Sequence, residues 1–387
     1  MRQSGDYMLY QLNGIPYLLP YGQGIADMRR GVRLNETGAY LWELLAAERS
    51  EEDILSLCAA HFQADNSELS VLKADVQHFL GQLRARGLLK DAPVSPKPTE
   101  EGFPLSIGGL TLLLTGAAEA VSNSFSAFAV DARDDFPPDQ IIEIRPFLPE
   151  VKPLGKVLLR GGNLMVLENE TGFVLIFPAA TNPLEAQLAP DGSRVILSAA
   201  GSLTEPFLKD IFHAIRLCFL YLAQRKGLFA LHSASFLYRD RIWLFSGHSG
   251  AGKSTHTNLW NRLMGVPLIN GDLNLLDRRD SLRPMVHGLP WCGTSGISTP
   301  GSWPLGGVIF LRQAPRNQVE QLPPEEQQLL LSQHLISPSW TKEQAVLNLE
   351  ASEKISSRVL IRRLCCTKEP EAMETVRAAM DQWLDKQ

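Results

Sequence analysis

The sequence lacks the features that mark membrane-spanning and secreted proteins. It has no run of about 20 uncharged apolar residues, the length that a membrane-spanning helix needs. Its most apolar stretch, residues 206–236, is interrupted by charged side chains and instead predicts a helix with one buried face, followed by a strand. No basic segment followed by an apolar one begins the chain, so no secretion signal is expected. We therefore expect a cytoplasmic protein with no membrane partner.

Cysteine pairs and excess positive charge are also missing. The cysteines are odd in number and contain no Cys-x-x-Cys pair, the spacing typical of zinc sites: Cys58, Cys218, Cys292, Cys365 and Cys366. We expect reduced thiols, with the last two buried in a strand. The net charge is −5, whereas nucleic-acid binders usually carry a basic excess, so no nucleic-acid partner is expected.

What is present is the composition of a globular chain, with 44% hydrophobic and 20% charged residues. The clearest boundary is the proline-rich stretch DAPVSPKPTEEG at residues 91–102, which predicts an extended linker. We expect an α/β fold that is α+β as a whole, in four parts. These are an N-terminal module (1–91), the linker (92–102), a β-rich subdomain (103–204) and a nucleotide-binding domain (205–387).

The N-terminal module begins with a predicted hairpin at residues 7–20, whose turn is Asn13-Gly14. Three helices are expected to follow, at residues 35–48, 50–62 and 69–87. Asn35 and Ser50 are the expected N-caps of the first two, and Gly87 is the expected end of the third. Two short helices, a longer third helix and a strand-like tail predict a winged helix.

Residues 33–45, RLNETGAYLWELL, are followed by an acidic helix start and by LRARGLL at 83–89. This pattern resembles the PqqD family over about residues 7–90. The resemblance implies a small peptide chaperone that holds the leader segment of a ribosomally made precursor for a modifying enzyme. In that family the leader adds to a strand edge and packs beside a helix. A module that only packs on the rest of the chain is the alternative.

Residues 103–200 are rich in short apolar runs separated by Gly, Asn and Asp, a pattern that predicts an antiparallel sheet. The expected strands lie at 105–116, 124–130, 141–147, 156–178 and 193–199. We find no catalytic pattern among them.

The motif GHSGAGKS at residues 247–254 follows the strand-like RIWLFS and precedes a predicted helix. Strand, glycine loop and helix are the context of a phosphate-binding loop, in which inward N–H groups and the helix N-terminus hold anions. We predict that ATP binds here with Mg²⁺, Lys253 reaching the β- and γ-phosphates and Ser254 ligating the metal. The expected binding residues are Gly247, His248, Ser249, Gly250, Ala251, Gly252, Lys253, Ser254 and Thr255.

Two further residues are candidates for the same site. Asp272 follows an apolar run and lies nineteen positions after Lys253, which is closer than in motor ATPases and Ras-like switches. It is the expected second Mg²⁺ ligand, with a strand-end turn as the alternative. His232 lies fifteen positions before Gly247, where a structural histidine is the alternative.

The order LHSASFLYRDRIWLFSGHSGAGKST…LINGD resembles the HPr kinase/phosphorylase family, whose nucleotide fold resembles PEP carboxykinase. The resemblance covers about residues 205–385 and includes PLGGVIFLRQAPRNQVEQLPPEEQQLLL at 304–331. It implies that Asp272, His232 and Lys253 are catalytic, and it makes a homo-oligomer possible. In the family, one aspartate of an Asp-Asp pair is the general base and its neighbour lies near the metal.

The chain departs from that family in two places. Gly271-Asp272 replaces the Asp-Asp pair, so whether Asp272 is base or metal ligand stays open. The segment VHGLPWCGTSG, residues 286–296, replaces the signature for phosphoserine removal, so dephosphorylation is not expected. This segment predicts a substrate-side loop beside the γ-phosphate, or alternatively a packed turn anchored by Trp291.

Together these features predict an ATP-dependent kinase of a ribosomally synthesised precursor peptide, with a Ser or Thr hydroxyl as acceptor and the N-terminal module as leader-binding site. Three alternatives stay open. They are a kinase of a free small molecule such as serine, an ATP-driven peptide modifier that activates a carboxylate or amide, and a non-enzymatic nucleotide-gated peptide carrier.

Overall fold

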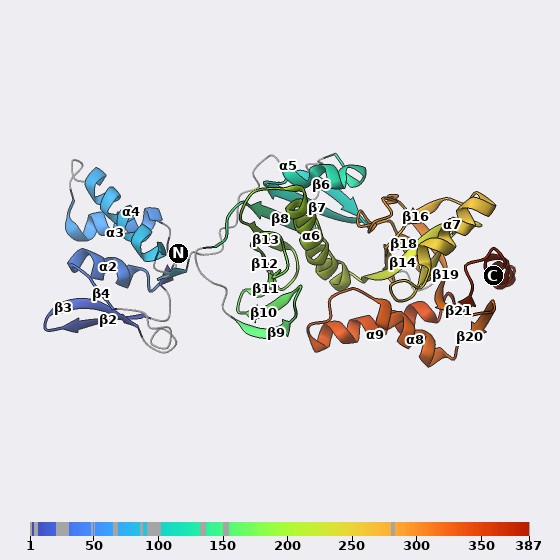
Figure 1. Ribbon diagram of the computed structural model, residues 1–387. Helices are drawn as coiled ribbons and strands as arrows, with labels where there is room; N and C mark the ends of the chain where they lie inside the picture. Colours follow the sequence, from blue (N-terminus) through green and yellow to red (C-terminus); the bar gives the residue numbers. More distant parts are fainter. Residues whose placement is uncertain are drawn as a thin grey trace. The chain divides into compact units, whose positions relative to one another are not determined.

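A computed structural model describes residues 2–3, 7–20, 31–47, 49, 51–64, 69–85, 88–90, 102–131, 137–149, 155–279 and 283–386. The chain divides into two compact units, Met1–Thr99 with Pro149–Lys152, and Glu100–Leu148 with Pro153–Gln387. Each contains helices and sheets (Figure 1), which confirms a mixed α/β composition consistent with α+β. The predicted linker lies outside the described residues apart from Gly102. None of the described helices combines the length and apolarity needed to cross a membrane.

The N-terminal unit holds a three-stranded antiparallel sheet in the order β2-β3-β4. Its strands are β2 (Tyr7–Leu12), β3 (Ile15–Pro20) and β4 (Val32–Arg33). Asn13 and Gly14 form the β2–β3 turn with φ of 51° and 79°, which confirms the predicted hairpin. Two further short strands, β1 (Arg2–Gln3) and β5 (Leu89–Lys90), pair with each other.

The three predicted helices are present as α2 (Glu36–Leu44), α3 (Glu51–Phe62) and α4 (Leu69–Ala85). The Asn35 side chain accepts a hydrogen bond of 2.8 Å from the Gly38 N–H, which confirms it as N-cap of α2. Ser50 and Gly87, the other expected helix boundaries, lie outside the described residues. The apolar faces of the helices and the sheet form one core, with members Tyr7, Leu18, Leu41, Trp42, Leu45, Ile54, Cys58, Val76 and Leu80. The winged-helix assignment stays a prediction.

The second unit begins with an eight-stranded sheet in the order β6-β7-β8-β13-β12-β11-β10-β9. The strands are β6 (Phe103–Ile107), β7 (Leu110–Gly116), β8 (Gln140–Arg145), β9 (Lys156–Arg160), β10 (Met165–Asn169), β11 (Gly172–Ile176), β12 (Leu184–Leu188) and β13 (Arg194–Ala199). The purely antiparallel prediction is wrong at β8, which runs parallel to both β7 and β13. The reason is a crossover between β7 and β8, since parallel neighbours cannot be joined by a tight turn.

The crossover contains the segment predicted as a strand at 124–130, which is also wrong. The structure places there the short helix α5 (Glu119–Ser122) and the 3₁₀ helix η1 (Asn123–Phe128). Phe125 and Phe128 are both buried. Residues three apart share one face of a 3₁₀ turn, whereas a strand would point them to opposite faces.

Helix α6 (Glu205–Arg225) leads into β14 (Leu228–Tyr238), as predicted, and shares a core with both sheets of this unit. The second sheet has the order β15-β14-β17-β18-β19-β21-β20, with β16 paired to β14. Its other strands are β15 (Arg241–Ser246), β16 (Leu268–Asn270), β17 (Leu273–Asp277), β18 (Met285–His287), β19 (Ser302–Gln313), β20 (Gln318–Gln321) and β21 (Leu360–Cys366). Because β19 pairs with β18 and also with β15, the sheet closes on itself.

The remaining helices are α7 (Lys253–Met264), α8 (Pro324–His334), α9 (Lys342–Ser356) and α10 (Glu371–Leu384). Cys365 and Cys366 lie buried in β21, as expected, and every cysteine is a free thiol.

An ionic network that is centred on the buried side chains of Asp277 and His287 joins the two sheets of the second unit. Asp277 Oδ2 lies 3.0 Å from His287 Nε2 and accepts a hydrogen bond of 2.7 Å from Arg279 Nη2, while His287 Nδ1 lies 2.6 Å from Ser302 Oγ. Arg279 also donates to the Gly108 carbonyl, in the β6–β7 turn, at 3.1 Å. Burial acts to raise the pKa of Asp277, but hydrogen bonds from His287 and Arg279 outweigh it and hold that pKa well below its usual range.

Replacing Asp277 by Asn is expected to lower the free energy of unfolding by about 2 kcal/mol at pH 7, because it removes charged hydrogen bonds from a buried site. The folded-state pKa of Asp277 lies below the unfolded value of about 3.9. The stabilisation of the folded state by the Asp277 carboxylate is therefore complete above the unfolded-state pKa of about 3.9, and it is lost as the pH falls toward the folded-state pKa. Urea denaturation at pH 7 and pH 3 should show the gap to wild type narrowing in acid. The exposed control Glu325→Gln should show no such gap at pH 7, and an equal gap at both pH values for Asp277→Asn would contradict the prediction.

Candidate functional site

The glycine loop connects the end of β15 to the start of α7. Gly247, Gly250 and Gly252 have φ of 148°, 79° and 103°, a region that residues with a Cβ rarely adopt, so the loop curls only with glycine at these positions. Ser246 Oγ donates to the His232 carbonyl at 2.8 Å, and Gln313 Nε2 donates to the Gly250 carbonyl at 2.9 Å. These bonds attach the loop to the neighbouring strands β14 and β19.

The start of α7 fits an anionic ligand. No side chain caps the helix at Gly252, so its first N–H groups are left to water or a ligand. Lys253 Nζ donates to the carbonyls of Gly247 at 3.0 Å and His248 at 3.3 Å, and so lies over the loop. Burial lowers the pKa of Lys253, and the nearby Asp272 opposes that shift. Open N–H groups and a lysine ammonium are what the phosphates of ATP require.

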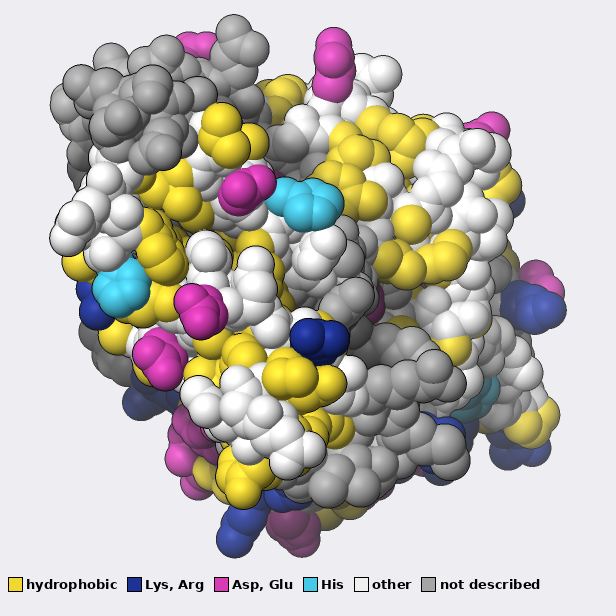
Figure 2. Space-filling view, turned by 90° about the vertical axis from the view of Figure 1, so that its left-hand side faces the viewer, with side chains coloured by type: hydrophobic (Ala, Val, Ile, Leu, Met, Phe, Trp, Pro, Cys, Tyr) yellow, Lys and Arg dark blue, Asp and Glu magenta, His cyan; other side chains and the backbone are white. Residues whose placement is uncertain are grey.

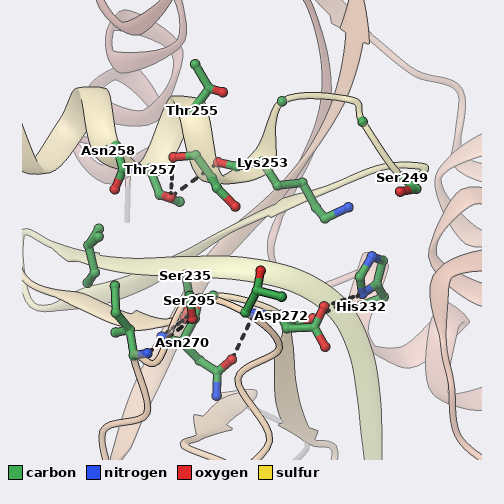
Figure 3. A pocket seen from close by; sticks show the side chains of 17 residues that line it. His232, Ser235, Ser249, Lys253, Thr255, Thr257, Asn258, Asn270, Asp272 and Ser295 are labelled. Carbon is green, nitrogen blue, oxygen red and sulfur yellow. Dashed lines mark hydrogen bonds and ion pairs between the residues drawn. The ribbon is translucent and has the colours of Figure 1, made fainter.

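These groups open into a cavity of about 600 Å³ (Figure 3). The predicted residues that line it are His232, Ser249, Gly250, Gly252, Lys253, Ser254, Thr255 and Asp272. Gly247, His248 and Ala251 belong to the loop but do not line the cavity, and Ala251 is buried. The lining residues that sequence reasoning did not assign to the site are Ser235, Thr257, Asn258, Leu268, Asn270 and Ile297.

Asp272 and His232 lie side by side across the cavity from Lys253 (Figure 3). His232 Nδ1 is 3.3 Å from Asp272 Oδ1 and 3.1 Å from its carbonyl oxygen. The hydrogen bond from His232 lowers the pKa of Asp272, and the charges of His232, Arg216 and Lys253 add to this against the effect of burial. Asp272 is therefore a carboxylate near neutral pH.

Asn270 positions the carboxylate. Its Oδ1 accepts from the N–H groups of Asp272 at 2.9 Å and Leu273 at 3.0 Å, a turn-forming pattern typical of asparagine. Its Nδ2 donates to the carbonyls of Leu289 at 2.9 Å and Trp291 at 3.3 Å. The dipeptide Asn-Gly after an apolar run indicates a turn, but the contact with residues 289–291 had no local signal.

The loop at residues 286–296 is a packed turn anchored by Trp291, one of its two predicted roles, and its far end reaches the cavity. Trp291 is buried and donates from Nε1 to the Phe212 carbonyl at 2.9 Å, so it anchors the loop on α6. Thr294 and Ser295 line the cavity. Whether this loop faces the γ-phosphate stays a prediction.

The same loop packs closely against Gly271 and Asp272. A Cβ added at Gly271 would collide with the Ser295 side chain, and one added at Gly293 would lie 2.9 Å from Asp272 Cβ. The Ser295 side chain therefore occupies the space that a side chain at position 271 would fill.

A Mg²⁺ ion would find few protein ligands in this cavity. The described residues contain no group of three or more His, Cys, Asp or Glu that could hold a metal, and Asp272 is the one carboxylate lining the cavity. Ser254 and Asp272 suit a magnesium ion that takes its other ligands from phosphate and water, as Mg²⁺ commonly does.

The N-terminal unit offers a different kind of site. No described strand pairs with the outer edge of β2, and Met8, Tyr10 and Leu12 along it are 46%, 55% and 43% exposed. Hydrophobic side chains are also exposed on the face drawn in Figure 2. An open edge with alternating apolar side chains is suited to pairing with an extended peptide.

Comparison with known families bears on this unit. Residues 25–89 match the model of coenzyme PQQ synthesis protein D (PqqD). The chain therefore carries a PqqD-like module, as the resemblance predicted, and PqqD domains bind precursor peptides. The search of curated proteins found no match to the chain. The resemblance of residues 205–385 to HPr kinases stays a prediction.

The contact between Gly271 and Ser295 can be tested by stability alone. Gly271→Ala is expected to lower the free energy of unfolding by about 1–3 kcal/mol, because the added methyl group overpacks the site. Ser295→Gly in the same chain should restore most of that loss. Urea denaturation of the two single variants and the double variant measures the coupling. Losses that simply add in the double variant would contradict the packing described above.

Proposed function

We propose that this protein is an ATP-dependent kinase that phosphorylates a Ser or Thr hydroxyl of a ribosomally synthesised precursor peptide. The observation that carries the proposal is the cavity in which the uncapped start of α7 and Lys253 face the Asp272–His232 pair. One side suits the phosphates of ATP, and the other suits an incoming hydroxyl.

Phosphoryl transfer depends mainly on positioning and on neutralising charge. The acceptor oxygen forms a bond to the γ-phosphorus while the bond from that phosphorus to the β-phosphate oxygen breaks, leaving ADP. The hydroxyl proton passes to the Asp272 carboxylate. Lys253 and the N–H groups of the loop and α7 stabilise charge on the phosphate oxygens. Mg²⁺, held by Ser254 and Asp272, would add to that neutralisation.

His232 has a supporting role in this scheme. Its contacts with the carboxylate and the carbonyl oxygen of Asp272 fix the orientation of the Asp272 side chain. The hydrogen bond also keeps Asp272 ionised, which an acceptor of a proton must be. The low pKa makes Asp272 a weak base, which suits a loose transition state in which the hydroxyl proton leaves late.

The PqqD-like module supports a peptide as the acceptor. A leader held on that module is tethered to the same chain as the cavity, which raises the effective concentration of the attached core peptide, to about the millimolar range for a short flexible linker. The core peptide then needs little affinity of its own for the cavity.

The activity can be tested with the full-length protein, ATP and a peptide encoded by a short open reading frame beside its gene. Mass spectrometry should show the peptide gaining one phosphoryl group. Asp272→Asn should lower kcat by about a hundredfold or more, because a general base contributes about that factor. Lys253→Met should lose nucleotide affinity as well. Phosphorylation of free serine at equal efficiency, or a dehydrated peptide with released phosphate, would contradict a peptide kinase.

Leader capture has its own test on β2. Tyr10→Ser is expected to weaken binding of the full precursor about tenfold, because an exposed aromatic side chain would lose its contact with the bound leader. Fluorescence anisotropy with a labelled leader peptide measures the affinity. The control Leu329→Ser removes an equally exposed apolar side chain from α8 and should leave it unchanged. Unaltered binding to the Tyr10 variant would exclude this strand as the docking edge.

A further inference from the structure

The cavity has one end that the phosphoryl-transfer scheme leaves unused. The charged side chains that line the cavity lie together at the other end, and they are Lys253, Asp272 and His232. Figure 3 shows Asn258, on α7, away from these charges, with Asn270 across the cavity from it. We call the region between Asn258 and Asn270 the neutral end, because no charged side chain of the described residues lines it.

Two apolar side chains, Leu268 and Ile297, also line the cavity. Leu268 lies two residues before Asn270 on β16, so their side chains share one face of the strand. Ile297 directly precedes Ser298, which forms a β-bridge with Asn270. Both apolar side chains are partly buried and flank Asn270. They therefore give the neutral end an apolar wall opposite Asn258.

Asn258 is a polar group of this end that the protein itself leaves unused. The hydroxyl groups of Ser235, Thr257 and Ser295 each donate to a backbone carbonyl oxygen, at 3.3, 3.2 and 2.7 Å. The Asn270 amide uses both of its polar atoms in the turn described above. The Asn258 side chain, in contrast, has no hydrogen-bond partner among the described residues. Its amide therefore offers a donor and an acceptor to a ligand in the cavity.

The direction of a bound nucleotide leads to this end. ATP with its γ-phosphate between Lys253 and Asp272 has its nucleoside at the opposite end of the cavity, because base and γ-phosphate are the two ends of the molecule. The first N–H groups of α7 hold the phosphates between them. Thr255 and Asn258 are three positions apart and share one face of α7, so a nucleotide that passes Thr255 continues to Asn258.

Building on the kinase function proposed above, we propose that the neutral end binds the adenine base of ATP. The base packs on Leu268 and Ile297, and its edge pairs with the Asn258 amide. Adenine presents an amino donor beside a ring-nitrogen acceptor, the pattern that asparagine binds with two hydrogen bonds in DNA recognition. Guanine presents two acceptors along the same edge, so one of the two bonds is lost. Asn258 is thus a specificity-determining residue for the nucleotide.

Equilibrium binding separates the base from the phosphates. The magnesium complexes of ADP, GDP and inorganic pyrophosphate are each titrated into full-length protein by calorimetry. Asn258→Ala should weaken MgADP binding about tenfold and lower the preference for ADP over GDP by a similar factor, because paired hydrogen bonds to one base edge discriminate by about that much. Pyrophosphate affinity should stay within about twofold of wild type, since the phosphates bind at the glycine loop and the start of α7.

The apolar wall predicts a different pattern. Leu268→Ser should weaken MgADP and MgGDP binding by similar factors and leave pyrophosphate binding unchanged, because both bases lose the same apolar contact. The matched control is Leu263→Ser, which replaces a 45% exposed leucine of α7 that does not line the cavity. This control should bind all three ligands as wild type does.

Each contrary outcome has its own meaning. Unchanged MgADP affinity in Asn258→Ala overturns the base site, and a raised KM for the peptide in that variant would then assign this end to the acceptor. Parallel loss of pyrophosphate affinity also overturns it, since Asn258 would then support the structure of α7. Equal affinity of wild type for MgADP and MgGDP overturns the pairing with adenine. Failure of wild type to bind either MgADP or pyrophosphate contradicts the kinase function itself.

Discussion

The hydrogen bonds of one buried side chain, Asn270, hold the candidate site together. The amide oxygen receives the N–H groups that turn the chain after β16 and set Asp272 at the cavity, while the amide nitrogen holds the carbonyls of Leu289 and Trp291. The carboxylate and the loop opposite it therefore depend on the same four bonds. Breaking these bonds would leave a buried amide without partners and so raise the free energy of the folded state, which makes the arrangement rigid. The contact between Gly271 and Ser295 and the packing of Gly293 on Asp272 follow from it.

This arrangement places the one carboxylate that lines the cavity across from the Lys253 ammonium. His232 hydrogen-bonds Asp272, and the charges of Lys253 and Arg216 further lower the pKa of that carboxyl group. Such a site neutralises the charge of a phosphoryl group in transit more readily than it binds a metal through several carboxylates.

The two units divide the work that the proposed function requires. The N-terminal unit has its own core and an open strand edge, and the match to the PqqD family falls within it. The second unit contains the cavity and is held together by α6 and by the network of Asp277, His287 and Arg279. Recognition of the peptide is thereby separated from chemistry on it, and the linked chain supplies proximity.

Local sequence determined the features that depend on a few neighbouring residues. The Asn13-Gly14 turn, the Asn35 cap and the order of strand, glycine loop and helix around Lys253 all follow from backbone preferences within one or two turns of chain. Tertiary structure alone decided the rest, because those contacts join distant parts of the sequence. It turned residues 123–128 into a 3₁₀ helix, ran β8 parallel to its neighbours, and brought Ser295 against Gly271. No local pattern encodes such pairs, since each depends on how helices and sheets pack once they have formed.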